Sequence, residues 1–305
     1  MTLYSIIAGI FLISSIRTIC SVSAQTAPLR ILIGSPVRKK PVILREFLDS
    51  LLRLERDNII TDYFFVDDND DPESTALLQE FARNTTTSCT IYRHPQKTEA
   101  YVCTENTHYW TSNLIARVTK SKNMMIEAAL KGNYDYLFLV DSDLVLHTKT
   151  LFYLVKAGKD IIAENHWTRW FAGSALQPSV WQEHDYNYNE EFLQKLRHPG
   201  VYPVKGLCAC TLVSRRALQL GVSFDRLEGV EYTGEDRHFC LRAEALGLRL
   251  FCDTHAPAFH IYRDSEVASI SRHIRRTEPD IYATVYSLSK THCKILQCKT
   301  ILLPE

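Results

Sequence analysis

Short apolar runs alternate with amphipathic segments along the first half of the chain. The apolar runs predict strands at residues 29–36, 63–71, 89–94 and 136–140. The segments between them carry apolar residues at helical spacing, which predicts helices at residues 41–53, 74–81 and 113–130. Strands that alternate with helices are typical of βαβ units, so we expect an α/β fold with a mainly parallel sheet.

The second half of the chain has a less regular pattern. Residues 206–218 predict a strand that leads into a short helix, and residues 232–247 predict a turn followed by a helix. Residues 248–263 predict a strand, a turn at Pro257 and a second short strand. Aromatic residues are concentrated between 166 and 184, where Trp170 and Trp181 stand among histidines and tyrosines. This segment is either an aromatic part of the core or a surface that stacks on sugar rings or bases.

Aspartates follow two of the predicted strands. Asp67 and Asp68 end the second apolar run, and Asp141 and Asp143 follow the run at residues 136–140. Ligands bind outside the carboxyl ends of the strands in open parallel sheets, so the four carboxylates can meet in one crevice. A divalent cation would offset their repulsion, and hard cations take oxygen ligands that they share with substrate phosphates. The other reading is structural, because Asp also favours turns.

The overall composition excludes one class of partner. The chain has 305 residues, of which 46% are hydrophobic and 23% are charged, as in globular proteins. The 35 Lys and Arg residues balance the 35 Asp and Glu residues. No basic field therefore favours nucleic acid, and a phosphate-bearing ligand would have to be bound by local charges.

The N-terminal segment predicts targeting to the secretory pathway. Residues 4–16 form an apolar run that is too short to span a bilayer, which needs about 20 apolar residues. Val22-Ser23-Ala24 resembles a cleavage site, so residues 1–24 are a signal peptide or, if the run extends past Arg17, a marginal membrane anchor. The protein would then lie in the ER or Golgi lumen, be secreted or be held at a membrane by its N-terminus. It would be cytoplasmic if this leader does not function.

The order of these segments resembles the GT-A class of nucleotide-sugar glycosyltransferases, especially the family 2-like enzymes. Lys122-Asn123, Ala128, Gly132 and Asp141-x-Asp143 stand in the order common in that family, and this is the most specific part of the match. The other segments are ILIGSP, FFVDDND, residues 206–218, and GEDRHFCLRAEALG with FHIYR after it. The Golgi mannan-polymerase subunit family shares the same plan.

The resemblance implies one GT-A domain at residues 29–270, with a Rossmann-like central sheet, and a C-terminal extension at 271–305. The donor would be a nucleoside-diphosphate sugar bound with Mn²⁺ or Mg²⁺. Asp143 would ligate the metal, Asp141 would ligate it through water or contact the ribose, and His260 would be a third ligand. The implied donor-binding residues are Pro36, Arg38, Asp67, Asp68, Lys122, Asn123 and Asp141.

The resemblance also implies a reaction of the hexosyltransferase class. Asp236 would be the general base of an inverting transfer, and the neighbouring Glu235 would help to bind the acceptor, a hydroxyl of a glycan, glycolipid or protein. Alternatively, both acids only complement a helix dipole. A retaining enzyme, as in the mannan-polymerase relatives, would not need this base, and an inactive relative would bind nucleotide sugars without transfer. A haloacid-dehalogenase-type phosphatase does not fit, because its Asp-x-Asp pair follows the first strand of its core domain.

Overall fold

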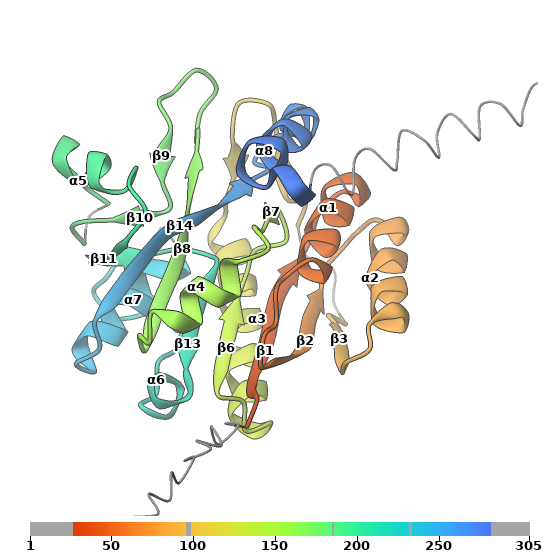
Figure 1. The fold of residues 1–305 in the computed structure, drawn as a ribbon, viewed down its shortest axis with the longest axis horizontal. Helices are drawn as coiled ribbons and strands as arrows, with labels where there is room; N and C mark the ends of the chain where they lie inside the picture. Colours follow the sequence, from red (N-terminus) through yellow and green to blue (C-terminus); the bar gives the residue numbers. More distant parts are fainter. Residues whose placement is uncertain (1–26, 96–98, 185, 232–233, 282–305) are drawn as a thin grey trace, which may run out of the picture.

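A mixed β-sheet runs through the middle of the molecule, with helices on both of its faces (Figure 1). The computed structural model describes residues 27–95, 99–184, 186–231 and 234–281. The predicted leader at residues 1–24 lies outside these ranges, as does the predicted extension beyond residue 281. Within the described residues, no helix combines the length and apolar character needed to cross a membrane.

The strands of the central sheet follow the order β11-β14-β8-β13-β6-β1-β2-β3. Their bounds are β1 (Leu29–Val37), β2 (Ile59–Asp67), β3 (Cys89–Arg93), β6 (Tyr136–Leu139), β8 (Ile161–Thr168), β11 (Val201–Val204), β13 (Thr211–Ser214) and β14 (Leu250–His260). Shorter strands are β4 (Val102–Cys103), β5 (His108–Tyr109), β7 (Leu144–Val145), β9 (Gln177–Pro178), β10 (Val180–Trp181) and β12 (Gly206–Leu207).

Two helical layers cover the sheet. The helices are α1 (Pro41–Leu52), α2 (Pro72–Asn84), α3 (Ser112–Lys131), α4 (Thr150–Lys156), α5 (Glu190–Lys195), α6 (Arg215–Gln219), α7 (Glu235–Ala245) and α8 (Ile270–Thr277), with a 3-10 turn η1 (Asp264–Ser269). One apolar core joins α1, α2 and α4 to the sheet, and a second joins α3, α6 and α7 to the opposite face. Neighbouring residues of β6 point into different cores, because side chains alternate along a strand.

Local sequence signals explain where the N-terminal helices begin. Pro41 stands in the first turn of α1, where its missing N–H is not needed. Asp71 caps α2 by accepting a hydrogen bond from the Glu73 N–H, and Thr111 caps α3 in the same way. These signals place the helix starts within two residues of the predicted positions.

The predicted α/β sheet is confirmed: β1, β2, β3 and β6 form one parallel part, and β8 and β14 form a second parallel pair. β1 lies between β2 and β6 and is parallel to both, while β3 continues this order beyond β2. β13 lies antiparallel between β6 and β8, and it therefore makes the sheet mixed. The carboxyl ends of β1, β2 and β6 meet at one edge, as βαβ geometry requires.

The predicted turn at Pro257 is wrong. β14 runs without a break from Leu250 to His260 and shifts its register against β8 between Asp253 and Ala258. Proline cannot donate to a ladder and is tolerated at such an irregularity. The continuous strand carries His260 to the edge of the sheet where β6 also ends.

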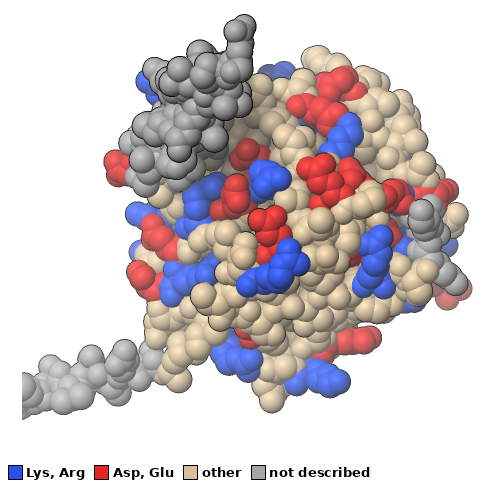
Figure 2. Space-filling view, turned by 90° about the vertical axis from the view of Figure 1, so that its right-hand side faces the viewer, with Lys and Arg blue, Asp and Glu red and all other residues tan. Residues whose placement is uncertain are grey.

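Helix α8 starts the segment that the sequence assigns to an extension. Its Ile270 and Ile274 are buried with Ile43, Val145 and Ile261 in a small third core. The described part of this segment thus packs against the domain, and the division at residue 270 stays a prediction. Acidic and basic side chains are interspersed on the face that Figure 2 shows, in line with the balanced composition.

A buried acid pair in the sheet makes stability depend on pH. Glu164 of β8 pairs in register with Asp253 of β14, and both are buried. Burial, with the Asp253 charge beside it, raises the pKa of Glu164 well above its ordinary value. In the folded protein Glu164 therefore stays protonated at pH values at which the same side chain in the unfolded chain has already lost its proton. The stability that this proton contributes is full below the unfolded pKa and is lost as pH rises toward the folded one.

We expect Glu164→Gln to flatten the decline of stability on the alkaline side. Each pH unit between the two pKa values costs the parent protein about 1.4 kcal/mol, whereas the neutral amide carries no such term. Denaturant melts from about pH 5 to about pH 8 would measure it. Glu80→Gln, at an exposed position on α2, is the matched control and should leave the slope unchanged. Equal slopes in the parent and in Glu164→Gln would contradict this account.

Candidate active site

A cavity of about 720 Å³ opens at the edge where β1 and β6 end. Its volume lies in the range of small-molecule sites. The predicted residues among those that line it are Pro36, Arg38, Asp68, Asp141, Asp143, Glu235, Asp236 and His260. The structure therefore brings together residues that lie more than 200 positions apart in the sequence.

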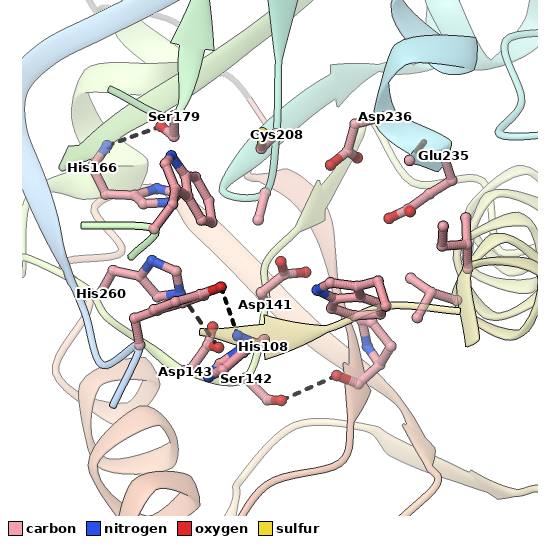
Figure 3. Close-up of a pocket in the computed structure, with 18 of the residues that line it drawn as sticks. His108, Asp141, Ser142, Asp143, His166, Ser179, Cys208, Glu235, Asp236 and His260 are labelled. Carbon is pink, nitrogen blue, oxygen red and sulfur yellow. Dashed lines mark hydrogen bonds and ion pairs between the residues drawn. The ribbon is translucent and has the colours of Figure 1, made fainter. Parts of the chain in front are cut away.

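The loop after β6 is tied to the end of β1. The N–H of Val140 donates to the Gly34 carbonyl at 3.0 Å, and the Ser142 hydroxyl donates to the Pro36 carbonyl at 3.1 Å. These two bonds tie the turn with Asp141 and Asp143 to the end of β1, and Figure 3 marks the one from Ser142. One bond is between backbone groups and the other comes from the Ser142 side chain, and they attach the residues on either side of Asp141 to β1.

Asp143 lies between two basic groups from other elements. Its Oδ2 is 2.6 Å from the Lys39 Nζ and 3.4 Å from the His260 Nε2. His260 reaches this position because the end of β14 pairs with β7, directly after Asp143. Burial alone would raise the pKa of Asp143, but Lys39 and His260 outweigh it and hold the pKa well below its ordinary value. The Asp143 carboxyl is thus kept as a carboxylate.

Asp141 has a different electrostatic setting. No ion pair to it occurs among the residues that the structure describes. Burial raises its pKa, and the Asp143 and Glu235 charges act in the same direction, whereas Lys122 and His260 oppose the rise. Figure 3 shows Asp141 between Asp143 on one side and Glu235 and Asp236 on the other. An incoming cation would relieve this concentration of negative charge.

The acids at the end of β6 fit a metal ion in part. Oδ1 of Asp143 is buried and has no hydrogen-bond partner within the described part of the chain, which leaves it available as a ligand. In those same residues, no three His, Cys, Asp or Glu side chains already stand in a metal-binding arrangement. Oxygen ligands of this type suit Mn²⁺ and Mg²⁺, which often complete their coordination with substrate phosphates and water. Lys39 forms an ion pair with Oδ2 of Asp143, and this ion pair would have to break before Asp143 could bind a metal with both oxygens.

Glu235 and Asp236 begin helix α7 and face the cavity from the other side (Figure 3). The Lys122 ammonium donates to Glu235 Oε1 at 2.7 Å and to Asp236 Oδ1 at 2.8 Å. Burial raises the pKa of Asp236 to about 7, with Lys122 opposing this and Glu235 and Asp141 adding to it. A carboxyl group with such a pKa can take up and release a proton near neutral pH.

Asp67 and Asp68 have separate surroundings although they are adjacent. Arg117 of α3 contacts Asp68 Oδ1 with two nitrogens, at 2.5 and 3.1 Å, and Arg38 lies 3.8 Å from the other oxygen. Asp67 is 2% exposed and does not line the cavity. It accepts hydrogen bonds from Arg93 and Thr75 instead, which ties β2 to β3 and α2.

Lys122 and Asn123 also lie outside the cavity lining. Asn123 accepts a hydrogen bond from the Phe224 N–H at 2.8 Å and donates to Asp225 at 2.7 Å. The Lys122 side chain is 3% exposed and lies behind Glu235 and Asp236. The structure therefore gives both residues protein partners, whereas the sequence predicts contacts with the donor.

Aromatic side chains form much of the remaining wall. The aromatic residues that line the cavity are Tyr101, His108, Trp110, His166, Trp170, Trp181, Tyr186, Tyr188, His260 and Tyr262. Trp170 and Trp181 belong to the segment for which the sequence left a core and a binding surface open, and here they line the cavity. The contributions of Tyr101, His108 and Trp110 were missed. Their segment has no clear strand or helix periodicity, so no signal in the sequence places it beside β14.

Comparison with known proteins places these observations in a family. The model of the Anp1 family matches residues 18–195, which is more than half of the chain. The match includes Asp141 and Asp143 but ends before Glu235, Asp236 and His260. No curated protein sequence matches the chain significantly.

Two solved structures resemble the fold. The mannosyltransferase PcManGT from Pyrobaculum calidifontis, in complex with GDP-Man and Mn²⁺, superimposes with a TM-score of 0.52 at 12% identity. The S. aureus TarS fragment 1–349 gives a TM-score of 0.50 at 15% identity. Each likeness covers 82% of this chain, which spans 61% of the first protein and 66% of the second. The predicted GT-A fold is thereby confirmed.

The Trp181 ring of the aromatic wall packs directly against the backbone of Gly206, where there is no room for a side chain. A Cβ atom at Gly206 would lie 1.7 Å from the Trp181 ring, so any side chain there would push the indole out of position. We expect Gly206→Ala to lower the free energy of unfolding by about 1–3 kcal/mol, the usual cost of overpacking. Denaturant melts would measure this loss.

The control for this variant is Gly234→Ala. Its backbone is extended and the new Cβ would lie 3.8 Å from the Tyr186 hydroxyl, an ordinary contact. It should cost less than about 1 kcal/mol, the scale of an N-cap change. Similar losses in the two variants would show that the Trp181 contact does not determine the tolerance at residue 206.

Proposed function

The chain belongs to the Anp1 family, a glycosyltransferase family of mannan polymerase subunits, and we propose that it moves a sugar from a nucleoside diphosphate to an acceptor hydroxyl. The observation that carries this proposal is the placement of two acidic centres in one cavity. Asp141 and Asp143 stand at the end of β6, and Glu235 and Asp236 stand opposite at the start of α7. One centre suits the charged donor and the other suits the acceptor.

The donor side would hold the nucleotide sugar through a divalent cation and basic side chains. Asp143, His260 and Asp141 would hold Mn²⁺ or Mg²⁺, which supplies Lewis-acid neutralisation of the diphosphate leaving group. Lys39 and Arg38 line the same cavity and add positive charge near these acids. The fold-related PcManGT was solved with GDP-Man and Mn²⁺, which supports a donor and metal of this type. Pro36 and Asp68 would line the nucleoside end.

The acceptor side would carry out the proton transfer. The acceptor oxygen forms a bond to the anomeric carbon as the bond from that carbon to the diphosphate breaks, and Asp236 takes the hydroxyl proton. Glu235 would bind the acceptor beside it. The aromatic wall would limit the access of water, which would otherwise compete as an acceptor. The acceptor itself would be a hydroxyl of a glycan, glycolipid or protein.

A second candidate is a retaining mannosyltransferase. Membership of the Anp1 family favours it, because the resemblance to the mannan-polymerase subunits implies retention of configuration, which would not need Asp236 as a base. The anomeric configuration of the product separates the two candidates, because direct displacement with a base inverts the configuration.

The protein would act in the secretory pathway. This proposal rests on the leader at residues 1–24 and on Asn84, the first residue of an Asn-Thr-Thr glycosylation sequon. The structure exposes Asn84 at the end of α2, where an oligosaccharide would meet no packed element. The leader would either be removed or keep the protein at a membrane.

Asp143→Ala should abolish metal-dependent donor binding. The variant removes the carboxylate that Lys39 and His260 contact, so the proposed cation site loses a ligand. Thermal shifts with a panel of nucleotide sugars, with and without Mn²⁺, would detect the loss, because a ligand that binds the native state raises its stability. Asp160→Ala, whose side chain pairs with Arg216 away from the cavity, is the control. Unchanged Mn²⁺-dependent shifts in a folded Asp143→Ala protein would refute the proposed metal site.

Asp236→Asn should remove the base and leave the donor bound. Turnover should fall by about a hundred- to ten-thousand-fold, the usual contribution of general-base catalysis. In the parent enzyme, kcat/KM should rise as pH increases through about 7, because the base must lose its proton and the pKa of Asp236 is raised to about 7. Rate profiles across this range and the anomeric configuration of the product would test both points. Near-normal turnover in Asp236→Asn, or retained configuration, would favour the second candidate.

A further inference from the structure

Lys122 occupies a position where the helical pattern predicts an apolar residue. It lies on α3 at helical spacing from Met125, Ile126 and Ala129, which all pack into the core. Its side chain is 3% exposed. An ammonium group is costly to bury, and the fold can carry it only because charged partners meet it.

The partners of Lys122 are the two acids of the acceptor side. One nitrogen contacts Glu235 Oε1 at 2.7 Å and Asp236 Oδ1 at 2.8 Å. The ring of Phe224 lies 5.0 Å from the same nitrogen, and Phe224 stacks on Phe239 of α7. The Lys122 ammonium therefore has an aromatic pair, Phe224 and Phe239, on one side, and it donates hydrogen bonds to both carboxylates.

We propose that Lys122 is a positioning residue, which fixes Glu235 and Asp236 against the acceptor without touching either substrate. This inference rests on the proposed function of Asp236. It differs from the donor contact that the sequence predicts for Lys122, and it explains why two acids can stand side by side at the start of α7. The N-cap residue, Gly234, has no side chain that could cap the helix, and the acids Glu235 and Asp236 stand in the first turn, where negative charge complements the helix dipole.

The charges around Glu235 and Asp236 make the positioning role of Lys122 measurable through the pH dependence of the rate. One cation faces two carboxylates, so their repulsion is only partly neutralised. Other titratable groups also face Asp236, namely Asp141 from the end of β6, Cys208 from the loop after β12 and Cys240 from α7. Against burial and these neighbours, the cation that contacts Asp236 and opposes the rise in its pKa is Lys122. Its removal should therefore make it harder for Asp236 to lose its proton.

The test compares Lys122→Met with Lys122→Arg and with a matched control. Lys205→Met removes another lysine that pairs with α7, through Glu244, but outside the cavity. Initial rates with a nucleotide-sugar donor would be measured across pH for all three variants. Circular dichroism would confirm that each variant is folded.

Lys122→Met should move the acid limb of kcat/KM upward by about one pH unit or more, the scale of a lost opposite charge. Its donor KM should stay within about twofold of the parent, because only an interaction outside the donor site is lost. Lys122→Arg keeps the charge and should return the limb to its parent position, at a lower kcat because the planar fork fits two carboxylates differently. Lys205→Met should match the parent throughout.

Two results would overturn the inference. An unshifted acid limb in folded Lys122→Met would reduce Lys122 to a structural role. A raised donor KM at unchanged kcat, in either Lys122 variant, would restore the donor contact that the sequence predicts. If Lys122→Met does not fold, the kinetics of Lys122→Arg decide: a lowered kcat at an unchanged donor KM supports the positioning role, and a raised donor KM at unchanged kcat overturns it. Asp236→Asn, measured in parallel, separates the failure of the proposed function from the failure of this inference. If Asp236→Asn stays active, the proposed function fails. If Asp236→Asn is inactive and the acid limb of Lys122→Met is unshifted, only the role of Lys122 fails.

Discussion

The neutralisation of buried carboxylates by cations from distant elements is the constraint on which this structure depends. Asp68, Asp143, Glu235 and Asp236 all line one cavity, and each lies beside a basic group that another element supplies. A carboxylate without such a partner would be expelled or protonated. Asp141 is the exception, since no ion pair to it occurs in the described chain. Burial therefore raises the pKa of Asp141, and Lys122 and His260 offset this rise only in part.

The sequence predicts the first half of the fold well because its signals are local. Apolar runs, helical spacing and the capping residues Asp71 and Thr111 all act within a few positions. β14 shows the limit of such signals. Pro257 indicates a turn in the sequence, but the neighbouring strand β8 accommodates it at a register shift, which only the paired sheet can reveal.

The sequence could indicate which acidic residues belong to the candidate site, but not which basic residue contacts each of them. The acids at the ends of β2 and β6 and at the start of α7 could be named from their positions in the pattern. Asp67 and Asp68 are adjacent, however, and the difference between them arises from whether Arg93 or Arg117 meets each one. Lys122 and Glu235 likewise lie 113 positions apart. Which basic side chain pairs with which acid depends on how the helices pack on the sheet, and the hydrophobic periodicity of a single sequence does not reveal it.

Helix α3 serves both sides of the cavity at once. Arg117 contacts Asp68 near the donor end, and Lys122 contacts Glu235 and Asp236 at the acceptor end. The two residues are about 7.5 Å apart along a stiff helix, at 1.5 Å per residue. A shift of α3 as a rigid helix would therefore move Arg117 and Lys122 together. Under the proposed function, the groups beside the donor and those beside the acceptor would then be coupled through one helix.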